Sequence, residues 1–215
     1  MKFTGRRGEG LASETGFSLA ELLVVLTMIL IVAGMSMPSL SRTIENTRLR
    51  GATQKLASAF QDARIRATQD NTSYEVILSA PGISPSQACL DLDDDGACDK
   101  GEPVTLLPSE VKLTNLGVPA PLDASALGFS PVSLENSFMR NQQNLLVPGL
   151  AWNALGLPCQ KSSPASPCTP VGWVQYLQFQ RPGGDIAYSA VTVSPTGRIR
   201  TWMYIPSGNG NGSWL

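Results

Sequence analysis

The stretch that decides the fold is GFSLAELLVVLTMILIVAGMSMPSL, at residues 16–40. From Phe17 to Met37 its residues are apolar or small, and the exceptions are Ser18, Glu21, Thr27 and Ser36. A helix of this length spans about 31 Å, which matches the hydrocarbon thickness of a bilayer. Basic residues precede the stretch, whereas acidic residues dominate far beyond it. The positive-inside rule therefore places the N-terminus in the cytoplasm and the bulk of the chain outside.

Three kinds of N-terminal segment fit this pattern. The stretch can be a secretory signal peptide with a poor cleavage site at 32–36, a plain signal anchor, or a leader cut at the Gly16–Phe17 bond. The third kind explains Glu21, because an unpaired carboxylate fully inserted in a bilayer costs about 2.5–3.5 kcal/mol. Cleavage at that bond creates a cationic amine on Phe17. This amine can pair with Glu21 of the same chain or of a neighbouring copy.

The motif G-F-S-L-A-E, followed by an apolar run and Pro38, resembles the class III (type IV) prepilin signal. The resemblance implies that residues 1–16 are a leader, which a dedicated peptidase removes after Gly16 on the cytoplasmic side before it methylates Phe17. It also implies that Glu21 is the assembly carboxylate and that Pro38 kinks the pilin helix. Residues 17–38 are then the transmembrane half of that helix.

Beyond Pro38 the helical pattern continues into an amphipathic half over residues 39–71. Residues at steps of three and four form one face, and they are Leu49, Ala52, Leu56, Ala59, Ala63 and Ala67. Asp70-Asn71 provides a stop, so we expect one helix, bent at Pro38, from about 18 to 70. Most basic residues of this half lie off the stripe, and we interpret them as a solvated face with contacts to neighbouring helices.

Residues 72–215 are expected to form a β-rich globular domain, which makes the chain an α+β protein. Strands are predicted at 73–79, 104–107, 111–116, 174–180, 186–193 and 199–205. The sequence Ser-Pro-Thr-Gly at 194–197 suits a tight turn between the last two strands. The stretch 79–90 is predicted to be a loop, and 117–172 is predicted to consist of long loops with short strands.

The segment VSPTGRIRTWMY, at 193–204, resembles the C-terminal hairpin of the GspH/FimT family, which comprises the H pseudopilin of type II secretion systems and related minor pilins. The resemblance covers 16–75 and about 173–205, whereas the middle departs from the shorter family core. It implies a type IV pilin-like fold, in which a long N-terminal transmembrane helix packs on an antiparallel β-sheet domain.

This family resemblance implies a structural subunit with no chemistry of its own. Such a subunit joins a filament or its tip, in a type II secretion system or a type IV pilus, by packing its apolar helix against other pilins. It is anchored in the bacterial inner membrane by one span, with the globular domain in the periplasm or in an extracellular filament. Its partners are other pilins or pseudopilins and the prepilin peptidase.

The composition argues against an enzyme. The chain has no histidine, which removes Ser-His-Asp and Cys-His catalysis and the usual histidine-bearing zinc sites. The formal net charge of −1 gives no global basic field for nucleic acid. A membrane-anchored calcium-dependent enzyme is disfavoured, because the clustered acidic residues suit ligand roles better than the roles of an acid–base pair.

Four cysteines form two pairs of equal spacing, Cys89 with Cys98 and Cys159 with Cys168. An even count with matched spacing predicts two local disulfides. Disulfides persist in oxidising compartments, which agrees with a globular domain outside the cytoplasm.

Residues 91–102 read DLDDDGACDKGE and fit the calcium-loop pattern D-x-D-x-D-G-x5-E. The candidate ligands are the carbonyl of Ala97 and the carboxylates of Asp91, Asp93, Asp95, Asp99 and Glu102. No amphipathic helix precedes the loop and Pro103 follows it, so we expect a stand-alone structural Ca²⁺ site within 89–102, closed by the first disulfide. The alternative is a solvated acidic loop, but six acidic residues in twelve repel one another strongly without a cation.

Arg198 and Arg200 are expected on one face of a strand, about 6.6 Å apart, with Trp202 further along that face. This spacing is close to that of phosphates in a nucleic acid. In some minor pilins of the GspH/FimT family a G-R-x-R motif at this hairpin serves DNA uptake, and 197–200 matches it. A DNA-binding minor pilin for natural transformation is therefore the alternative function. Charged protection of an edge strand, or contacts to a neighbouring subunit, would explain the same arginines.

Overall fold

The computed structural model describes residues 16–79, 84–114, 117–119, 121–122, 124–133, 138–140, 146–160, 169–181, 184–206 and 212–215. Within these ranges the side chains of 35–41, 124, 132–133, 138–140, 146–149 and 169 are not described. The chain divides into two compact units, Met1–Arg42 and Thr43–Leu215.

Helix α1, Leu19–Gln69, is a single helix with a clear signal at each end. Ser18 precedes the first turn, and its Oγ accepts a hydrogen bond from the backbone N–H of Glu21 at 3.2 Å. At the other end Asn71 has a φ of 49°, and the N–H of Thr72 donates to the carbonyl of Ala67. A left-handed residue just past the last turn is a common helix terminator. The predicted helix from about 18 to 70 is therefore confirmed.

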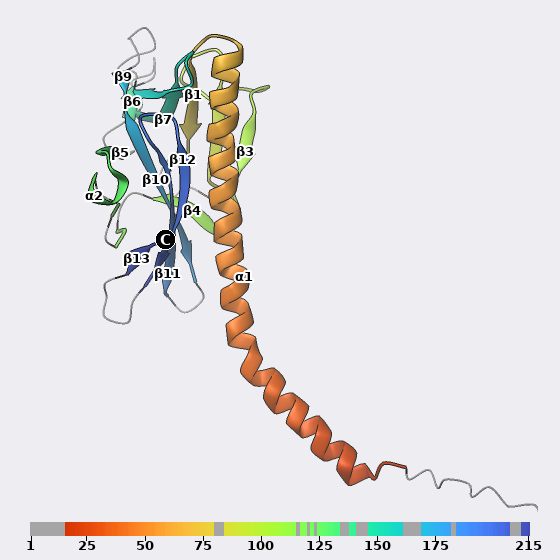
Figure 1. The fold of residues 1–215 in the computed structure, drawn as a ribbon. Helices are drawn as coiled ribbons and strands as arrows, with labels where there is room; N and C mark the ends of the chain where they lie inside the picture. Colours follow the sequence, from red (N-terminus) through yellow and green to blue (C-terminus); the bar gives the residue numbers. More distant parts are fainter. Residues whose placement is uncertain are drawn as a thin grey trace, which may run out of the picture. The chain divides into compact units, whose positions relative to one another are not determined.

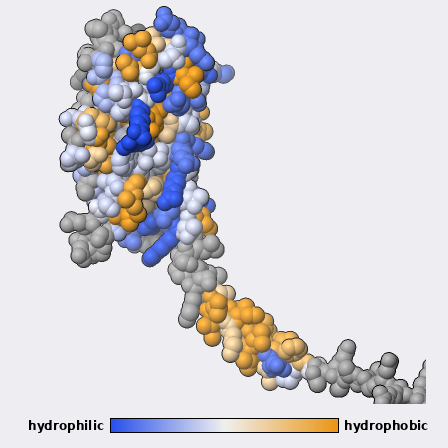
Figure 2. Space-filling view, viewed as in Figure 1, coloured by the Kyte–Doolittle hydropathy of each residue, from blue (hydrophilic) through white to orange (hydrophobic). Residues whose placement is uncertain are grey.

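The N-terminal unit contributes the first part of α1, with side chains described from Leu19 to Gly34. The surface of this part is almost continuously apolar and appears orange in Figure 2. In the part of the chain that the structure describes, none of the helices combines the length and the apolar character needed to cross a bilayer. The predicted bend at Pro38 falls within 35–41, whose side chains lie outside the described residues.

In the globular unit, α1 packs a narrow stripe of small and apolar side chains against the sheets (Figure 1). Five of the six predicted stripe residues are fully buried, namely Leu49, Ala52, Leu56, Ala63 and Ala67. Ala59 is the exception, because it lies half-buried at the margin of the stripe. Phe60 belongs to the same buried face, and Thr53 bonds Ser189 of the sheet through a hydroxyl pair at 2.7 Å.

The first sheet has the strand order β3-β2-β1-β7-β8-β9, with β6 paired to β7. Its strands are β1 Tyr74–Leu78, β2 Gln87–Asp91, β3 Val104–Leu106, β6 Phe138–Arg140, β7 Leu146–Trp152, β8 Pro158–Gln160 and β9 Thr169–Pro170. Each of these pairings is antiparallel. Val76 and Leu78 of β1 join the core beneath α1.

The second sheet has the order β13-β12-β11-β10-β4, and β5 pairs in parallel with β10. Its strands are β4 Val111–Thr114, β5 Pro131–Ser133, β10 Gly172–Gln180, β11 Ile186–Val193, β12 Ile199–Ile205 and β13 Ser213–Trp214, and the short helix α2 is Ala124–Leu127. Leu177 and Val191 belong to the core beneath α1, whereas Tyr176 and Ala190 form a second cluster with Leu122. A long N-terminal helix on antiparallel sheets is consistent with a pilin-like α+β fold.

The prediction that 79–90 is a loop is wrong in its second half, because β2 occupies Gln87–Asp91. A stretch rich in Ser, Pro and Gly precedes this strand and hides it in the sequence. Four of its five residues are buried, and it pairs with β1 in the register Glu75↔Asp91. Burial against a partner strand, rather than local propensity, makes this segment extended. The six predicted strands are confirmed as β1, β3, β4, β10, β11 and β12.

Strand β7 is the main element that the sequence pattern of 117–172 does not reveal. Pro148 and Gly149 lie inside it, and both residue types argue against a strand interior. The strand nevertheless pairs with β1, where Tyr74 is opposite Trp152. Leu150 and Trp152 are buried, so long-range packing overrides the local signal.

Candidate functional site

The predicted cleavage site, the Gly16–Phe17 bond, is exposed to solvent in the structure. Gly16 is exposed and Phe17 is 77% exposed, and both lie before the first turn of α1. Ser18 and Glu21 form the S-x-x-E pattern of a capping box, in which Ser18 satisfies one of the free N–H groups of the first turn. The sequence analysis missed this structural role of Ser18, although the spacing alone signals it. The observed cap is made by the Ser18 hydroxyl and the backbone N–H of Glu21, so the Glu21 carboxylate is not needed for it.

The apolar side chains of the helix that follows are largely exposed in the described part of the N-terminal unit. Twelve large apolar side chains between Phe17 and Val32 are 47–83% exposed. Burying one such side chain fully is worth about 1.5–3 kcal/mol. A surface of this size is unfavourable in water and indicates an apolar environment or partner.

The acidic loop begins at a buried carboxylate. Asp91 is the last residue of β2 and is 1% exposed. Its Oδ1 accepts the N–H of Asp94 at 2.7 Å, and its Oδ2 accepts the N–H of Gly96 at 2.9 Å. Asp94 and Gly96 have φ values of 63° and 76°, so the backbone turns around this carboxylate. Asp94 adopts the left-handed region that aspartate tolerates better than most residues.

Glu102 closes the loop from its other end. Its Oε1 accepts the N–H of Leu92 at 2.7 Å, and its Oε2 accepts the N–H of Asp99 at 2.9 Å. The disulfide between Cys89 and Cys98 is formed, as predicted, and ties β2 to the loop. The second predicted pair is described in part: Cys159 is disulfide-bonded, and Cys168 lies outside the described residues.

The structure brings the predicted carboxylate ligands together in two overlapping groups. One group is Asp91, Asp93 and Glu102, and the other is Asp93, Asp95 and Asp99, with ligand atoms within 4.8 Å in each. Ala97, the predicted carbonyl ligand, lies beside the second group, where its backbone N–H donates to Asp95 Oδ1 at 2.7 Å. Acidic groups arranged in this way provide the hard oxygen ligands that Ca²⁺ prefers. Carboxylate oxygens that accept a backbone N–H keep a further lone pair for a cation.

Glu75 is an acidic residue of this region that the sequence analysis missed. It lies on β1 opposite Asp91, is 4% exposed, and forms a third close group with Asp91 and Asp94. No spacing rule links it to the loop, because only the β1–β2 register brings it there. The burial of Asp91 raises the pKa of its carboxyl, and the charges of Glu102 and Asp95 raise it further, against the lowering effect of the Gly96 and Asp94 N–H groups. A cation would offset this concentration of negative charge.

Arg198, Arg200 and Trp202 lie on one face of the hairpin, as predicted, and line a cavity of about 410 Å³. Both arginines are exposed, and the Arg200 guanidinium lies 6.0 Å from the Trp202 ring centroid. Trp202 Nε1 donates to Thr192 Oγ1 at 2.8 Å, which fixes the indole. The other described lining residues are Leu127, Gly128, Phe129, Thr192, Ser194, Pro195 and Thr196. We call this site the arginine pocket.

The turn beside the arginine pocket is held from α1. Arg64 Nη1 donates to the carbonyl of Gly197 at 2.9 Å. Gly197 has a φ of 81°, and a Cβ there would lie 2.8 Å from the carbonyl oxygen of Gly156. Only glycine combines this backbone conformation with this close approach. The Ser194 Oγ accepts the N–H of Arg198 at 3.0 Å, so the arginines extend from a well-defined turn.

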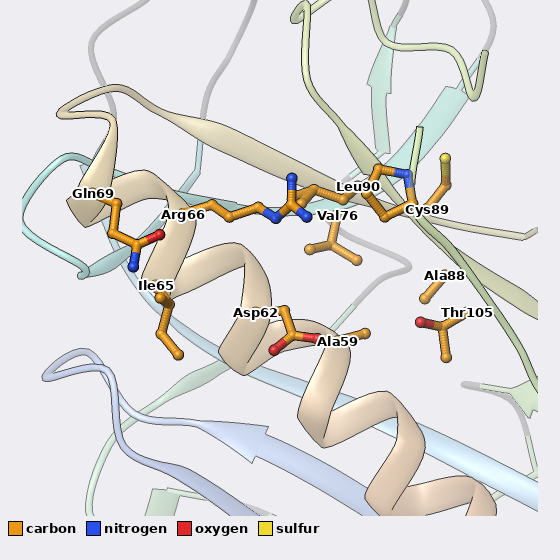
Figure 3. Close-up of a pocket in the computed structure, with 11 residues that line it drawn as sticks. Ala59, Asp62, Ile65, Arg66, Gln69, Val76, Ala88, Cys89, Leu90 and Thr105 are labelled. Atoms are coloured by element: carbon orange, nitrogen blue, oxygen red, sulfur yellow. The ribbon is translucent and has the colours of Figure 1, made fainter. Parts of the chain in front are cut away.

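A groove of about 340 Å³, separate from the arginine pocket, lies between α1 and the edge of the first sheet (Figure 3). Its α1 side carries Asp62, Arg66 and Gln69, and Val76, Ala88 and Leu90 come from the strands. The sequence analysis did not anticipate this groove, because it forms between α1 and strands that are distant from it in the sequence. Comparisons of the chain with protein-family models, with curated proteins and with solved structures found no match.

Proposed function

We propose that this chain is a membrane-anchored, pilin-like structural subunit. It is a minor pseudopilin of a type II secretion system, or a minor pilin of a type IV pilus, and it has no chemistry of its own. The observation that carries the proposal is the run of exposed apolar side chains from Phe17 to Val32 on a helix whose other half is embedded in a β-rich unit. In the sequence this apolar run continues to Met37, which gives it the length of a bilayer span.

The subunit inserts residues 17–38 once into the bacterial inner membrane and presents its globular unit in the periplasm or in an extracellular filament. Prepilin peptidase cuts the exposed Gly16–Phe17 bond and methylates Phe17. The Glu21 carboxylate pairs with the new Phe17 amine of its own or a neighbouring chain, and Pro38 bends the helix. The partners in the filament are other pilins or pseudopilins.

The test of this processing is the mass of the N-terminal peptide of the chain extracted from bacterial membranes. We expect the mature chain to begin at an N-methylated Phe17, because cleavage is what supplies a cation for Glu21 in lipid. Gly16→Leu is the matched variant, and it should leave residues 1–16 attached. An N-terminus elsewhere in the wild-type chain, or an unmethylated one, would contradict the proposal.

The acidic loop adds a structural Ca²⁺ site to this proposal. Asp91, Asp93, Asp95, Asp99 and Glu102 would hold the ion through carboxylates, and Ala97 through its carbonyl. The support is the pair of overlapping ligand groups that share Asp93, together with the burial of Asp91. The bound ion would neutralise the loop and stabilise the turn between β2 and β3, and no switching role is assigned to it.

The arginine pocket supports a second candidate function, which is DNA binding by a minor pilin. Two exposed guanidinium groups beside an indole provide phosphate contacts and a stacking surface. We expect wild-type chain to retard DNA in a mobility-shift assay at low salt, and R198A/R200A to weaken binding at least tenfold and lower the salt slope by about 2.

The control for this measurement is R50A/R66A, which removes the same charge from exposed positions of α1. It should bind DNA nearly as well as the wild type. Absence of a shift by the wild type at low salt, or equal losses in the two double variants, would remove DNA from consideration.

A further inference from the structure

We infer that the arginine pocket receives the acidic loop of a second copy of this chain, so that copies associate side by side and head to tail. The inference rests on the proposed function in one respect: anchoring in one membrane makes neighbouring copies stand parallel. The occupant is the segment 91–102 of the neighbour.

The two surfaces have opposite formal charges. The loop 91–102 contains six acidic residues and one lysine, a formal charge of −5. The described lining of the arginine pocket contains Arg198 and Arg200 and no acidic residue. Among the described residues, the arginines in ion pairs with carboxylates are Arg48 with Glu110 and Arg181 with Glu45. A bound Ca²⁺ would still leave the loop with a charge of about −3.

Both surfaces lie at the same level along α1. The hairpin turn at one end of the pocket lies next to the penultimate turn of the helix, where Arg64 holds the carbonyl of Gly197. The loop leaves β2 at Asp91, opposite Glu75, and β1 starts at Tyr74, only a few residues after α1 ends at Gln69. Two parallel copies placed side by side therefore bring the loop of one to the height of the pocket of the other.

The two surfaces lie on different faces of the globular unit, because Leu127 and Trp202 of the arginine pocket pack on the second cluster and not on the core beneath α1. Arg64 faces the hairpin turn, whereas Asp62 and Arg66 line the groove that reaches Cys89 and Pro103 at the two ends of the loop. With 100° between successive residues, position 64 falls on one side of the buried stripe of α1 and positions 62 and 66 on the other. The loop and the pocket of one copy thus lie on different faces. A contact between different patches on two copies is heterologous, and it leaves one free pocket and one free loop on the pair.

Both surfaces are already held in place by contacts within one copy, so binding does not have to order them. Gly197 and Ser194 hold the turn that carries the arginines, and the disulfide and Glu102 close the loop. Preorganisation lowers the entropy cost of association. Asp93 and Asp99 are exposed on the loop and available to pair with guanidinium groups. Such pairs are directional and are weakened by salt.

The test is charge reversal with mutual rescue, measured by sedimentation of the full-length chain in detergent micelles at low salt. Chelator is present throughout, so that loss of Ca²⁺ ligands has no effect on the comparison. We expect R198E/R200E and D93R/D99R each to weaken self-association at least tenfold. An equimolar mixture should recover association to within about threefold of the wild type, because the two glutamates of one variant's pocket then meet the two arginines that replace exposed aspartates in the other variant's loop. Recovery also shows that both variants are folded.

The inference is overturned if the mixture dissociates as readily as the separate variants, or if neither variant differs from the wild type. It is also overturned if R198E/R200E loses DNA retention and keeps normal association, a result that favours the second candidate function. The N-terminal mass of the same preparations tests the proposed function independently. A methylated Phe17 with no recovery in the mixture removes this contact and leaves the filament subunit in place.

Discussion

Replacing Glu21 with glutamine is expected to reduce incorporation of the chain into filaments by at least tenfold while cleavage after Gly16 continues. The substitution removes the negative charge that pairs with the Phe17 amine in lipid, where an uncompensated charge costs about 2.5–3.5 kcal/mol. Glutamine retains the S-x-x-Q form of the capping box, so the start of α1 is preserved. The measurement is the fraction of mature chain that copurifies with sheared filaments, relative to the total in the membrane.

Ser18→Ala is the matched control for this experiment. It removes the hydrogen bond from the Glu21 N–H to Ser18 Oγ and leaves the carboxylate intact. Loss of an N-cap costs about 0.5–2 kcal/mol of helix stability, so a small decrease in incorporation is expected. If Ser18→Ala is as defective as Glu21→Gln, then the cap of α1 and not the charge of Glu21 controls incorporation into filaments, and the pairing model is wrong.

Removing Ca²⁺ is expected to lower the thermal unfolding midpoint of the globular unit by about 5–10 °C. Ligand at about one hundred times its dissociation constant stabilises a folded protein by about 2.7 kcal/mol. For a unit of this size, each kcal/mol corresponds to about 2–4 °C. The measurement is a melt of the full-length chain in detergent, with excess Ca²⁺ or with chelator. Mg²⁺ should replace Ca²⁺ poorly, because it demands a stricter octahedral geometry.

The variant Asp93→Asn tests the proposed Ca²⁺ ligands directly, because Asp93 belongs to both ligand groups. The variant should be less stable than the wild type in Ca²⁺. It should be equally or more stable in chelator, since it then relieves repulsion within the loop. Asp185→Asn makes the same change at an exposed position outside the loop and should change neither midpoint. Identical wild-type midpoints with and without Ca²⁺ would mean that the loop is a solvated acidic turn.

Several features of the molecule follow from local sequence and were predicted without the structure. The extent of α1 follows from the apolar run, the stripe with helical spacing and the stop at Asp70-Asn71. The hairpin of β11 and β12 follows from alternating residues on both sides of Ser-Pro-Thr-Gly. The first disulfide and the turn of the acidic loop follow from spacing within a dozen residues. In each case the interacting groups are close in the chain, so the local sequence pattern is enough to predict the interaction.

The features that were missed depend on residues that are distant in the chain. Strand β7 contains a proline and a glycine, and it is extended because β1 pairs with it and because Trp152 is buried there. Glu75 joins the acidic loop only through the register of β1 with β2. Arg64 reaches Gly197 across 133 positions of sequence, and Ala59 lies at a groove instead of within the core.

The sequence by itself determined that a long apolar helix continues into an amphipathic one, that β-structure follows, and that acidic and basic residues are concentrated at 91–102 and 198–200. The tertiary structure alone decided that these two charged segments lie on different faces of the globular unit. The physical reason is that helical periodicity and turn chemistry act over a few residues. Strand order and register, by contrast, are set by burial of the whole core.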